Sequence, residues 1–400
     1  MKKLFVFFAL ISSCSIFSQG DLEVKGIVLD RFRKPIKFAS VSVPKLYLGT
    51  TTTEEGKFSI ILSESDFTDQ DVIQISSFGN ETLKMTVKEY IALKEKVIVI
   101  GGDVISPKQD KTVANNNSKP KIKPVIKKKP AKEYLRLANK YLKRNTINTP
   151  HQLKMLYRRF SVEDKKARFL VEHIINVLDK GPLNGNYKGV QVLTGRQSED
   201  HRLVKKTMMG HPVNQTAKTD PQRIGIINDN YAWKIVGSSS YDGEDIVIIE
   251  GINKKNRLVR FYIGVDTYGI YKIEKSSLNA VYIYSKDEDG KLHLSYHNRT
   301  RPGRVTLTDE QKKLLNTDKD FIKESYKHEV FVLGVKRLVD KDYDASVYVF
   351  HRKDIGDIET EYNPKFWQKL NLPPSTAFYL ESIEEIEKIS GKPIEKQFNK

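Results

Sequence analysis

Residues 22–62 read LEVKGIVLDRFRKPIKFASVSVPKLYLGTTTTEEGKFSIIL, and apolar side chains alternate with polar ones through much of this run. A period of two is typical of β-strands that bury one face and expose the other. Gly26 interrupts the first alternating segment, which predicts a bulge or a close approach of another backbone. Gly56 lies in a predicted tight turn, where we expect its φ angle to be positive. The run therefore predicts short β-strands joined by tight turns.

The same pattern continues to residue 100. Candidate strands cover residues 22–28, 38–43, 47–53, 58–62, 72–77, 83–87 and 96–100. Turn residues separate them at intervals of roughly 8 to 12 residues, which is typical of small all-β sandwiches. We therefore expect residues 22–100 to form an all-β N-terminal sandwich of about seven strands.

Four short motifs in this region together resemble the carboxypeptidase-regulatory-like domain. They are Val24-Lys25-Gly26-Ile27-Val28, Pro35-Ile36 with Ala39-Ser40-Val41-Ser42-Val43, Gly49-Thr50-Thr51-Thr52 with Glu55-Gly56-Lys57-Phe58, and Ile75-Ser76-Ser77-Phe78-Gly79. The resemblance implies a seven-stranded, transthyretin-like sandwich of the kind found in exported surface proteins of gram-negative bacteria. It implies no catalytic activity, because that domain accompanies carboxypeptidases without being the peptidase.

The N-terminus has the features of a secretory signal peptide, predicted to span residues 1–19. Lys2 and Lys3 precede an apolar run, Leu4–Ile11, that is too short to cross a bilayer core of about 30 Å. We expect an exported protein that is located in the periplasm or associated with the outer membrane.

Cys14, the single cysteine, lies within this signal peptide, so we expect no disulfide and no thiol chemistry in the mature chain. The run Ile11-Ser12-Ser13-Cys14 resembles a bacterial lipobox, in which the cysteine becomes lipidated. The run Phe17-Ser18-Gln19-Gly20 suits ordinary cleavage equally well. We expect a soluble secreted form, with lipidation of Cys14 as the alternative.

Residues 101–131 form a predicted linker in which lysine, proline and asparagine dominate. The whole chain carries a formal net charge of +18, which suits nucleic acid, an acidic polymer or an anionic membrane as a partner. Export and the lack of nucleic-acid-binding motifs argue against nucleic acid. The alternatives that remain are peripheral contact with an anionic membrane or glycan, and a basic spacer that only keeps the protein soluble.

Residues 132–400 are expected to form an α+β domain dominated by antiparallel sheet. Apolar residues at helical spacing predict a helix over residues 131–143 and another within residues 373–390. Period-two runs predict long strands over residues 152–163 and 168–180, and residues 230–300 predict a meander of hairpins.

Part of this meander is similar to the half-barrels of lipoprotein carriers. The similar segments are Tyr231-Ala232-Trp233-Lys234, Tyr241–Ile249 with its Asp-Gly turn, and Phe261–Ile270 with Asp-Thr before the next strand. They also resemble an uncharacterised C-terminal region that often accompanies the regulatory-like sandwich. The carrier resemblance implies a sheet that curves over a hydrophobic ligand.

Motifs for known enzyme chemistry are missing from the sequence. A metallocarboxypeptidase zinc site needs His-x-x-Glu, and no histidine here has a glutamate three positions later. There is no HExxH, no G-x-S-x-G nucleophile elbow and no dinucleotide or phosphate-loop fingerprint. We therefore predict no catalytic residues, no metal site and no cofactor.

Two weaker patterns resemble parts of metal sites. His293 and His297 would lie on one strand face if the strand were regular, and a solvated strand face is the simpler interpretation. Asp287-Glu288-Asp289-Gly290 resembles part of a calcium loop, but Asn298 stands where such a loop needs glutamate. A hairpin turn is the favoured interpretation of that run.

Arg158, Arg159, Arg196 and Arg202, together with His201, form a candidate anion-binding patch if their strands pair. The alternative is ordinary surface charge on an exposed sheet.

Three functions remain open. The first is a non-enzymatic cell-envelope protein with a binding or adaptor role towards an unidentified envelope protein or surface component. The second is a carrier or sensor of a lipid or other hydrophobic ligand in a C-terminal half-barrel, which predicts a deep apolar cavity between that sheet and a helix. The third is a hydrolase built from scattered residues.

Overall fold

The computed structural model describes residues 21–101 except 47 and 64, residues 129–337 except 204 and 227–229, and residues 352–398. The predicted signal peptide, Cys14 and most of the predicted linker lie outside these ranges. Within them, no helix is both long and apolar enough to span a membrane.

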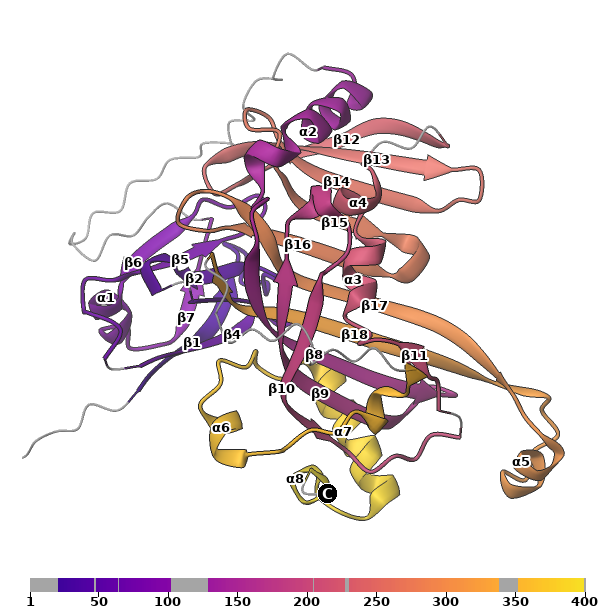
Figure 1. Cartoon of the computed structure of the whole chain (residues 1–400). Helices are drawn as coiled ribbons and strands as arrows, with labels where there is room; N and C mark the ends of the chain where they lie inside the picture. Colours follow the sequence, from indigo (N-terminus) through magenta and orange to yellow (C-terminus); the bar gives the residue numbers. More distant parts are fainter. Residues whose placement is uncertain are drawn as a thin grey trace, which may run out of the picture.

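The N-terminal region is a sandwich of two small sheets, with seven strands as predicted (Figure 1). One sheet has the order β4-β1-β7 and the other β3-β2-β5-β6. The strands are β1 (Leu22–Leu29), β2 (Ser40–Val43), β3 (Leu48–Thr51), β4 (Lys57–Leu62), β5 (Val72–Ser76), β6 (Leu83–Thr86) and β7 (Val97–Val99). Their inward side chains, among them Val24, Val41 and Phe58, form one buried cluster. The one-turn helices η1 (Pro44–Leu46) and α1 (Val87–Ile91) were not predicted.

Both glycine predictions are confirmed. A Cβ atom on Gly26 would lie 2.4 Å from the carbonyl oxygen of Lys96, so only glycine allows β1 and the approach to β7 to pack this closely. Gly56 has a φ angle of +74° in the turn that precedes β4.

The rest of the chain is built on one antiparallel sheet of ten strands, in the order β10-β9-β8-β18-β17-β16-β15-β14-β13-β12. Neighbours in the sheet are neighbours in sequence except at β18, which lies between β17 and β8 and so joins the first hairpins to the meander. The strands are β8 (His151–Glu163), β9 (Lys166–Asp179), β10 (Gly189–Gln197), β12 (Tyr231–Tyr241), β13 (Glu244–Asn253), β14 (Leu258–Gly264), β15 (Ile270–Lys275), β16 (Ala280–Lys286), β17 (Leu292–Thr306) and β18 (Phe321–Lys336).

One face of this sheet, here called the helical face, carries Tyr157, Phe261 and Tyr282. It packs against α2 (Ala131–Asn145), α3 (Asn214–Thr219) and α4 (Pro221–Ile224). The two-stranded ribbon of β11 (Met208–Met209) and β19 (Arg352–Lys353) leads into η4 (Ile355–Asp357), whose Ile355 packs on the same face. The predicted helix at residues 131–143 is therefore confirmed, with two further residues at its end.

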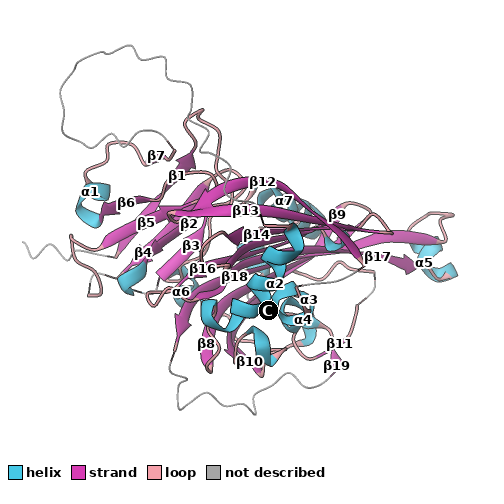
Figure 2. Cartoon of the chain, turned by 90° about the horizontal axis from the view of Figure 1, so that it is seen from above, coloured by secondary structure: helices cyan, strands magenta, loops and turns pink. Residues whose placement is uncertain are grey.

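The opposite face, here called the sandwich face, carries Leu156, Phe160 and Tyr296. It is covered by the N-terminal sandwich and by α6 (Pro364–Gln368), α7 (Ala377–Ser390) and α8 (Ile394–Gln397). Figure 2 shows the sandwich strands lying beside the large sheet. The remaining elements are η2 (Pro182–Asn184), η3 (Ser276–Leu278) and α5 (Asp309–Leu314), the last at the tip of the β17–β18 hairpin.

The sandwich packs directly against the large sheet through side-chain and backbone contacts. The ring of Phe38 stacks on Tyr296 with centroids 5.2 Å apart. The Asn371 side-chain amide donates to the carbonyl oxygen of Ile61 at 3.0 Å, and the backbone N–H of Gly79 donates to Ser240 at 2.8 Å. These contacts fix the position of β3 and η1 above the sandwich face.

Candidate functional site

Two adjoining cavities lie between the N-terminal sandwich and the sandwich face of the large sheet. The first contains about 630 Å³ of empty space, and the second, which is more open, about 1130 Å³. Both are lined by Leu48 from β3 and by Leu333, Gly334 and Val335 from β18. We call the two together the interdomain groove.

A β-bulge in β18 shapes the floor of the interdomain groove. The pairing of β18 with β8 shifts by one residue between Val332 and Gly334, so Leu333 is the extra residue of the bulge. A Cβ atom built on Gly334 would meet no other atom within 4 Å. The floor is thus open above Gly334, with the Leu333 side chain beside it.

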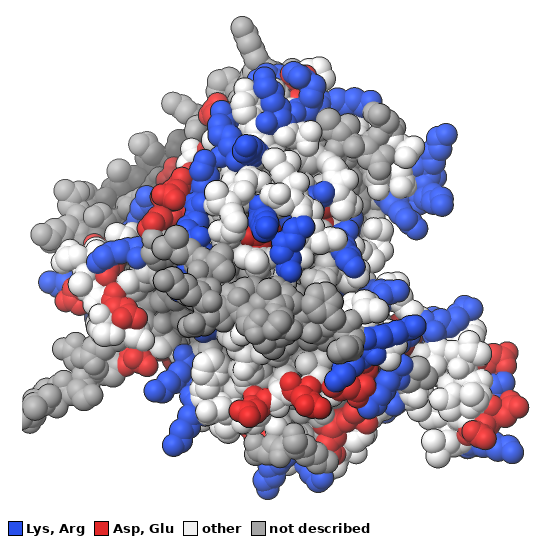
Figure 3. Space-filling model, viewed as in Figure 1, with Lys and Arg blue, Asp and Glu red and all other residues white. Residues whose placement is uncertain are grey.

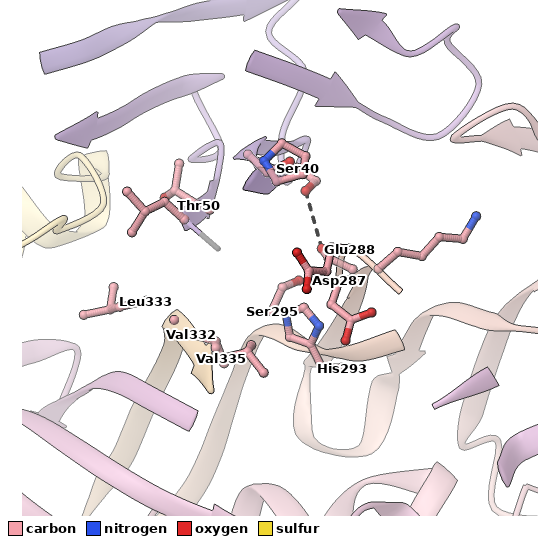
Figure 4. Close-up of a pocket in the computed structure, with 16 residues that line it drawn as sticks. Ser40, Thr50, Asp287, Glu288, His293, Ser295, Val332, Leu333 and Val335 are labelled. Carbon is pink, nitrogen blue, oxygen red and sulfur yellow. Dashed lines mark hydrogen bonds between the residues drawn. The ribbon is translucent and has the colours of Figure 1, made fainter. Parts of the chain in front are cut away.

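Hydroxyl groups from both the sandwich and the large sheet line the first cavity. Ser40 and Thr50 belong to the sandwich, and they face Ser295 and His293 of β17 across the cavity (Figure 4). Ser40 Oγ lies 3.4 Å from Ser285 Oγ, which ties the sandwich to β16 at the wall. Burial lowers the pKa of His293 to about 4, so the imidazole is neutral near pH 7.

The second cavity combines an apolar floor with a basic rim. Leu46, Leu193 and Leu370 add apolar surface to the shared residues, and Leu193 is 40% exposed. Three lysines line the rim of the second cavity: Lys154, Lys336 and Lys369. None of the described residues that line this cavity is an aspartate or glutamate. Burial lowers the pKa of Lys154, whose ammonium lies 5.7 Å from the ring centroid of Phe366.

This arrangement suits binding rather than catalysis. The floor can cover an apolar chain, the lysines can pair with an acidic group, and the hydroxyls can donate or accept hydrogen bonds. In the described ranges, no set of three or more His, Cys, Asp or Glu side chains is arranged to hold a metal ion. The groove has no local signature in the sequence, because its walls come from segments hundreds of residues apart.

The structure separates the four arginines of the predicted anion patch, so the prediction of one patch is wrong. Arg158 and Arg159 are consecutive in β8, and consecutive residues of a strand point to opposite faces. Arg158 and Arg196 meet on the sandwich face, whereas Arg159 and Arg202 meet near Asp354 on the helical face.

Both pairs are buried against carboxylates instead of forming an exposed cationic surface. The Nε atoms of Arg158 and Arg196 each lie 2.6 Å from a Glu172 oxygen, and Glu172 is fully buried. Arg202 donates to Asp354 at 2.8 Å and to Asp200 at 2.7 Å. The prediction treated the sheet as exposed, but α7, α8 and residues 352–357 cover it on both sides. His201 stays apart from both pairs, 3.9 Å from Glu199.

The two histidines of β17 do not share a face, contrary to the expectation from their spacing. The pairing of β17 with β16 shifts by one residue at Ser295, and such a bulge reverses the faces of the residues that follow. His297 therefore stacks on Tyr282 of the helical face, with centroids 4.1 Å apart, while His293 lines the interdomain groove. His297 is fully buried and His293 is half-buried, so the interpretation as a solvated strand face is also wrong.

The hairpin turn at residues 287–290 is confirmed. The backbone N–H of Gly290 donates to Asp287 at 3.0 Å, and Gly290 has a φ angle of +70°. The Asp287 carboxylate also accepts from the backbone of Lys291 and pairs with Arg337.

Basic side chains concentrate on the exposed side of α2. Its exposed positions are Lys132, Arg136, Asn139, Lys140, Lys143 and Arg144. Figure 3 shows Lys and Arg side chains gathered around this helix at the top of the molecule. Contact between such a surface and an anionic membrane or glycan stays a prediction.

Comparison with known proteins identifies no family. No protein-family model matches the chain, and no curated relative matches it. The regulatory-like identity of the N-terminal sandwich therefore stays a prediction, while its seven strands are observed.

Solved structures match the chain only at low similarity. A DUF1329 family protein from Desulfovibrio piger has a TM-score of 0.26 at 11% identity, covering 55% of this chain and 99% of that protein. A domain of a putative outer membrane lipoprotein-sorting protein from Vibrio parahaemolyticus has a TM-score of 0.24 at 12% identity, covering 55% and 100%. A LolA superfamily protein from Nitrosomonas europaea has a TM-score of 0.17 at 13% identity, covering 56% and 99%. Scores this low carry no argument about this chain, which we describe as a mostly β protein with two small N-terminal sheets and one ten-stranded antiparallel sheet.

Proposed function

We propose that this protein is a non-enzymatic binding protein of the cell envelope, and that its interdomain groove holds an acidic amphiphile such as a fatty acid. The observation that carries the proposal is the second cavity, where a leucine floor meets lysines and no carboxylate is found among the described residues that line it. An acyl chain on the floor removes apolar surface from water, and its acidic end group lies within reach of the rim.

The groove differs in place from the half-barrel cavity expected from the sequence. Beneath α2, Tyr134, Leu135 and Ala138 are packed into the helical face and are almost fully buried. The cavity beside α4 is smaller, about 340 Å³, and Asp179, Asp220 and Arg223 are among its lining residues. The helical face therefore offers less apolar space than the groove. An adaptor role towards an envelope partner stays a prediction.

A fluorescent fatty acid tests the apolar part of the proposal. The Gly334→Leu substitution fills the open floor without a backbone penalty, because Gly334 does not have a positive φ angle. We expect cis-parinaric acid to bind the wild-type protein and to bind Gly334→Leu at least tenfold more weakly. Gly237→Leu on β12 is the matched control, since a Cβ atom there also meets only an ordinary contact, at 3.7 Å, and it should bind as the wild type does. If Gly334→Leu and Gly237→Leu bind cis-parinaric acid with equal affinity, the groove is not the fatty-acid site.

The basic rim is tested separately with the same probe and its methyl ester. Lys154→Gln combined with Lys369→Gln should weaken the acid at least threefold and leave the ester unchanged. The charge-matched control combines Lys365→Gln with Lys388→Gln, because neither lysine lines the groove. Equal losses for acid and ester would show that the lysines do not pair with the acidic group.

A further inference from the structure

A row of basic side chains crosses the helical face of the large sheet, away from the interdomain groove. Arg159 of β8 pairs in register with His328 of β18, and His328 pairs with Arg299 of β17. Side chains in register on neighbouring antiparallel strands project from the same face. Since strands lie about 4.8 Å apart, the two arginine backbones are roughly 10 Å apart with the histidine between them.

Both guanidinium groups are buried, with exposed fractions of 2% for Arg159 and 5% for Arg299. The nearest carboxylate to Arg159 is that of Asp354, 3.7 Å away. That carboxylate already accepts two hydrogen bonds from Arg202 and others from the backbone of Lys206 and Gly356. The Nε and Nη2 atoms of Arg159 have no hydrogen-bond partner among the described residues.

Arg299 has no carboxylate within ion-pair distance in the part of the chain that the structure describes. Burial lowers the pKa of both arginines, as expected for charges that the protein does not fully compensate. A buried cation without a full partner is destabilising. Arg299 has no carboxylate partner among the described residues, and Arg159 shares the carboxylate of Asp354 with Arg202, so together they indicate a further negative group on this face.

The neighbouring histidines and Tyr157 are uncharged near pH 7. Burial holds the pKa of His328 well below its ordinary value and lowers that of His297 to about 3, so both rings are neutral near pH 7. Burial also raises the pKa of Tyr157, which keeps its proton. The Tyr157 hydroxyl is hydrogen-bonded to Nδ1 of His328. When the phenol donates, the proton of His328 is left on Nε2, where it can donate to an anion.

The row continues towards the surface through further basic residues. Two residues further along the strands, Tyr326 of β18 pairs with Ser161 of β8 and with Arg301 of β17, and Arg301 is exposed. The ammonium of Lys206 lies 5.4 Å from the ring centroid of Tyr326. Besides Asp354, the carboxylate of Glu324 lies on this side, and it pairs with Lys206 and accepts a hydrogen bond from Tyr326. Exposed cations at the rim raise the local concentration of anions near the buried pair.

We propose that Arg159 and Arg299, with His328 between them, bind a phosphate group. A phosphate presents oxygens in several directions, so guanidinium groups on two sides can bind it together, and its two negative charges match the two cations. The site lies on the opposite face of the sheet from the interdomain groove, and it does not depend on the function proposed for that groove. The phosphate can be free, or it can be the head group of a lipid.

Thermal unfolding of the full mature chain in phosphate-free buffer, with and without inorganic phosphate, tests this site. We expect phosphate to raise the unfolding temperature of the wild type, because a ligand that binds only the folded state stabilises it. Arg299→Gln should unfold at a higher temperature than the wild type without phosphate, since it removes a buried unpaired cation, and it should not respond to phosphate. Arg304→Gln, an exposed arginine of the same strand, is the matched control and should respond as the wild type does.

Calorimetric titration completes the test. Arg299→Lys keeps the charge and should weaken phosphate binding about tenfold without abolishing it. Dihexanoyl phosphatidic acid binding more tightly than inorganic phosphate would identify a lipid head group, and the reverse order would identify the free ion; both support the site. Failure of the wild type to bind either probe, or an unchanged phosphate response in Arg299→Gln, would overturn the proposal.

Discussion

The Glu172→Gln substitution should destabilise the protein more than most single changes, because Glu172 joins the buried Arg158 to the half-buried Arg196. Its carboxylate accepts from Arg158 and from Arg196 at 2.6 Å each, and its side chain is fully buried. Glutamine keeps the shape of the side chain but removes the negative charge that both guanidinium groups face. Its amide N–H group would also point at one of the guanidinium groups, where two donors meet without an acceptor. Breaking a buried pair by removing one partner costs about 3–5 kcal/mol. Glu329, 3.4 Å from Arg158, compensates only part of this loss.

Urea unfolding followed by tryptophan fluorescence measures the effect, since Trp367 lies over Arg196 at 4.3 Å. Glu133→Gln removes an exposed pair with Arg136 on α2 and should leave the unfolding midpoint unchanged. Arg196→Met in the Glu172→Gln background should recover part of the lost stability, because it removes one of the uncompensated cations. A free energy loss below about 1 kcal/mol for Glu172→Gln would refute the account of the cluster.

Two further outcomes follow from burial on the helical face and from packing in the sandwich. Burial lowers the pKa of His173 and His297 to about 3, so each binds a proton in the unfolded chain below about pH 6.5 but not in the folded protein. The unfolding free energy should therefore fall by up to about 1.4 kcal/mol per pH unit for each such histidine as the pH drops from 6.5 towards 3. His297→Phe should flatten this dependence, and an unchanged slope in urea titrations at several pH values would contradict it. Gly26→Ala should cost about 2 kcal/mol or more by driving a Cβ atom against Lys96, whereas Gly49→Ala, with its nearest contact at 3.5 Å, should melt close to the wild type.

Local patterns in the sequence predict the strands of this protein well. The seven strands of the sandwich, the helix at α2 and the turn at residues 287–290 all follow from periodicity and turn residues close in sequence. Each of these features depends on residues that lie close together in the sequence, so local patterns are enough to predict it.

The candidate site could not be predicted in the same way. Single-residue bulges at Ser295 and Leu333 reverse or open a strand face. Gly334 stands beside the second bulge, but one glycine in a strand does not show which residue is the extra one. The arginine prediction failed because burial of Arg158 depends on α7, more than two hundred residues later in the chain. The groove depends on contacts between distant segments, such as Phe38 with Tyr296, Asn371 with Ile61 and Gly79 with Ser240.

The position of β18 between β17 and β8 has a consequence for how the chain folds. The hairpins of β8–β10 and the meander of β12–β17 are each continuous in sequence and can pair locally, but β18 is the last strand of the sheet to be synthesised. Until it is available, β8 and β17 each present an unpaired edge, which is the kind of surface that promotes aggregation. Closing the sheet brings His151 and Lys336, near opposite ends of the domain sequence, into neighbouring strands, and such long-range pairing slows folding. Fragments that end before Phe321 should therefore be insoluble even though most of the sheet's residues are present.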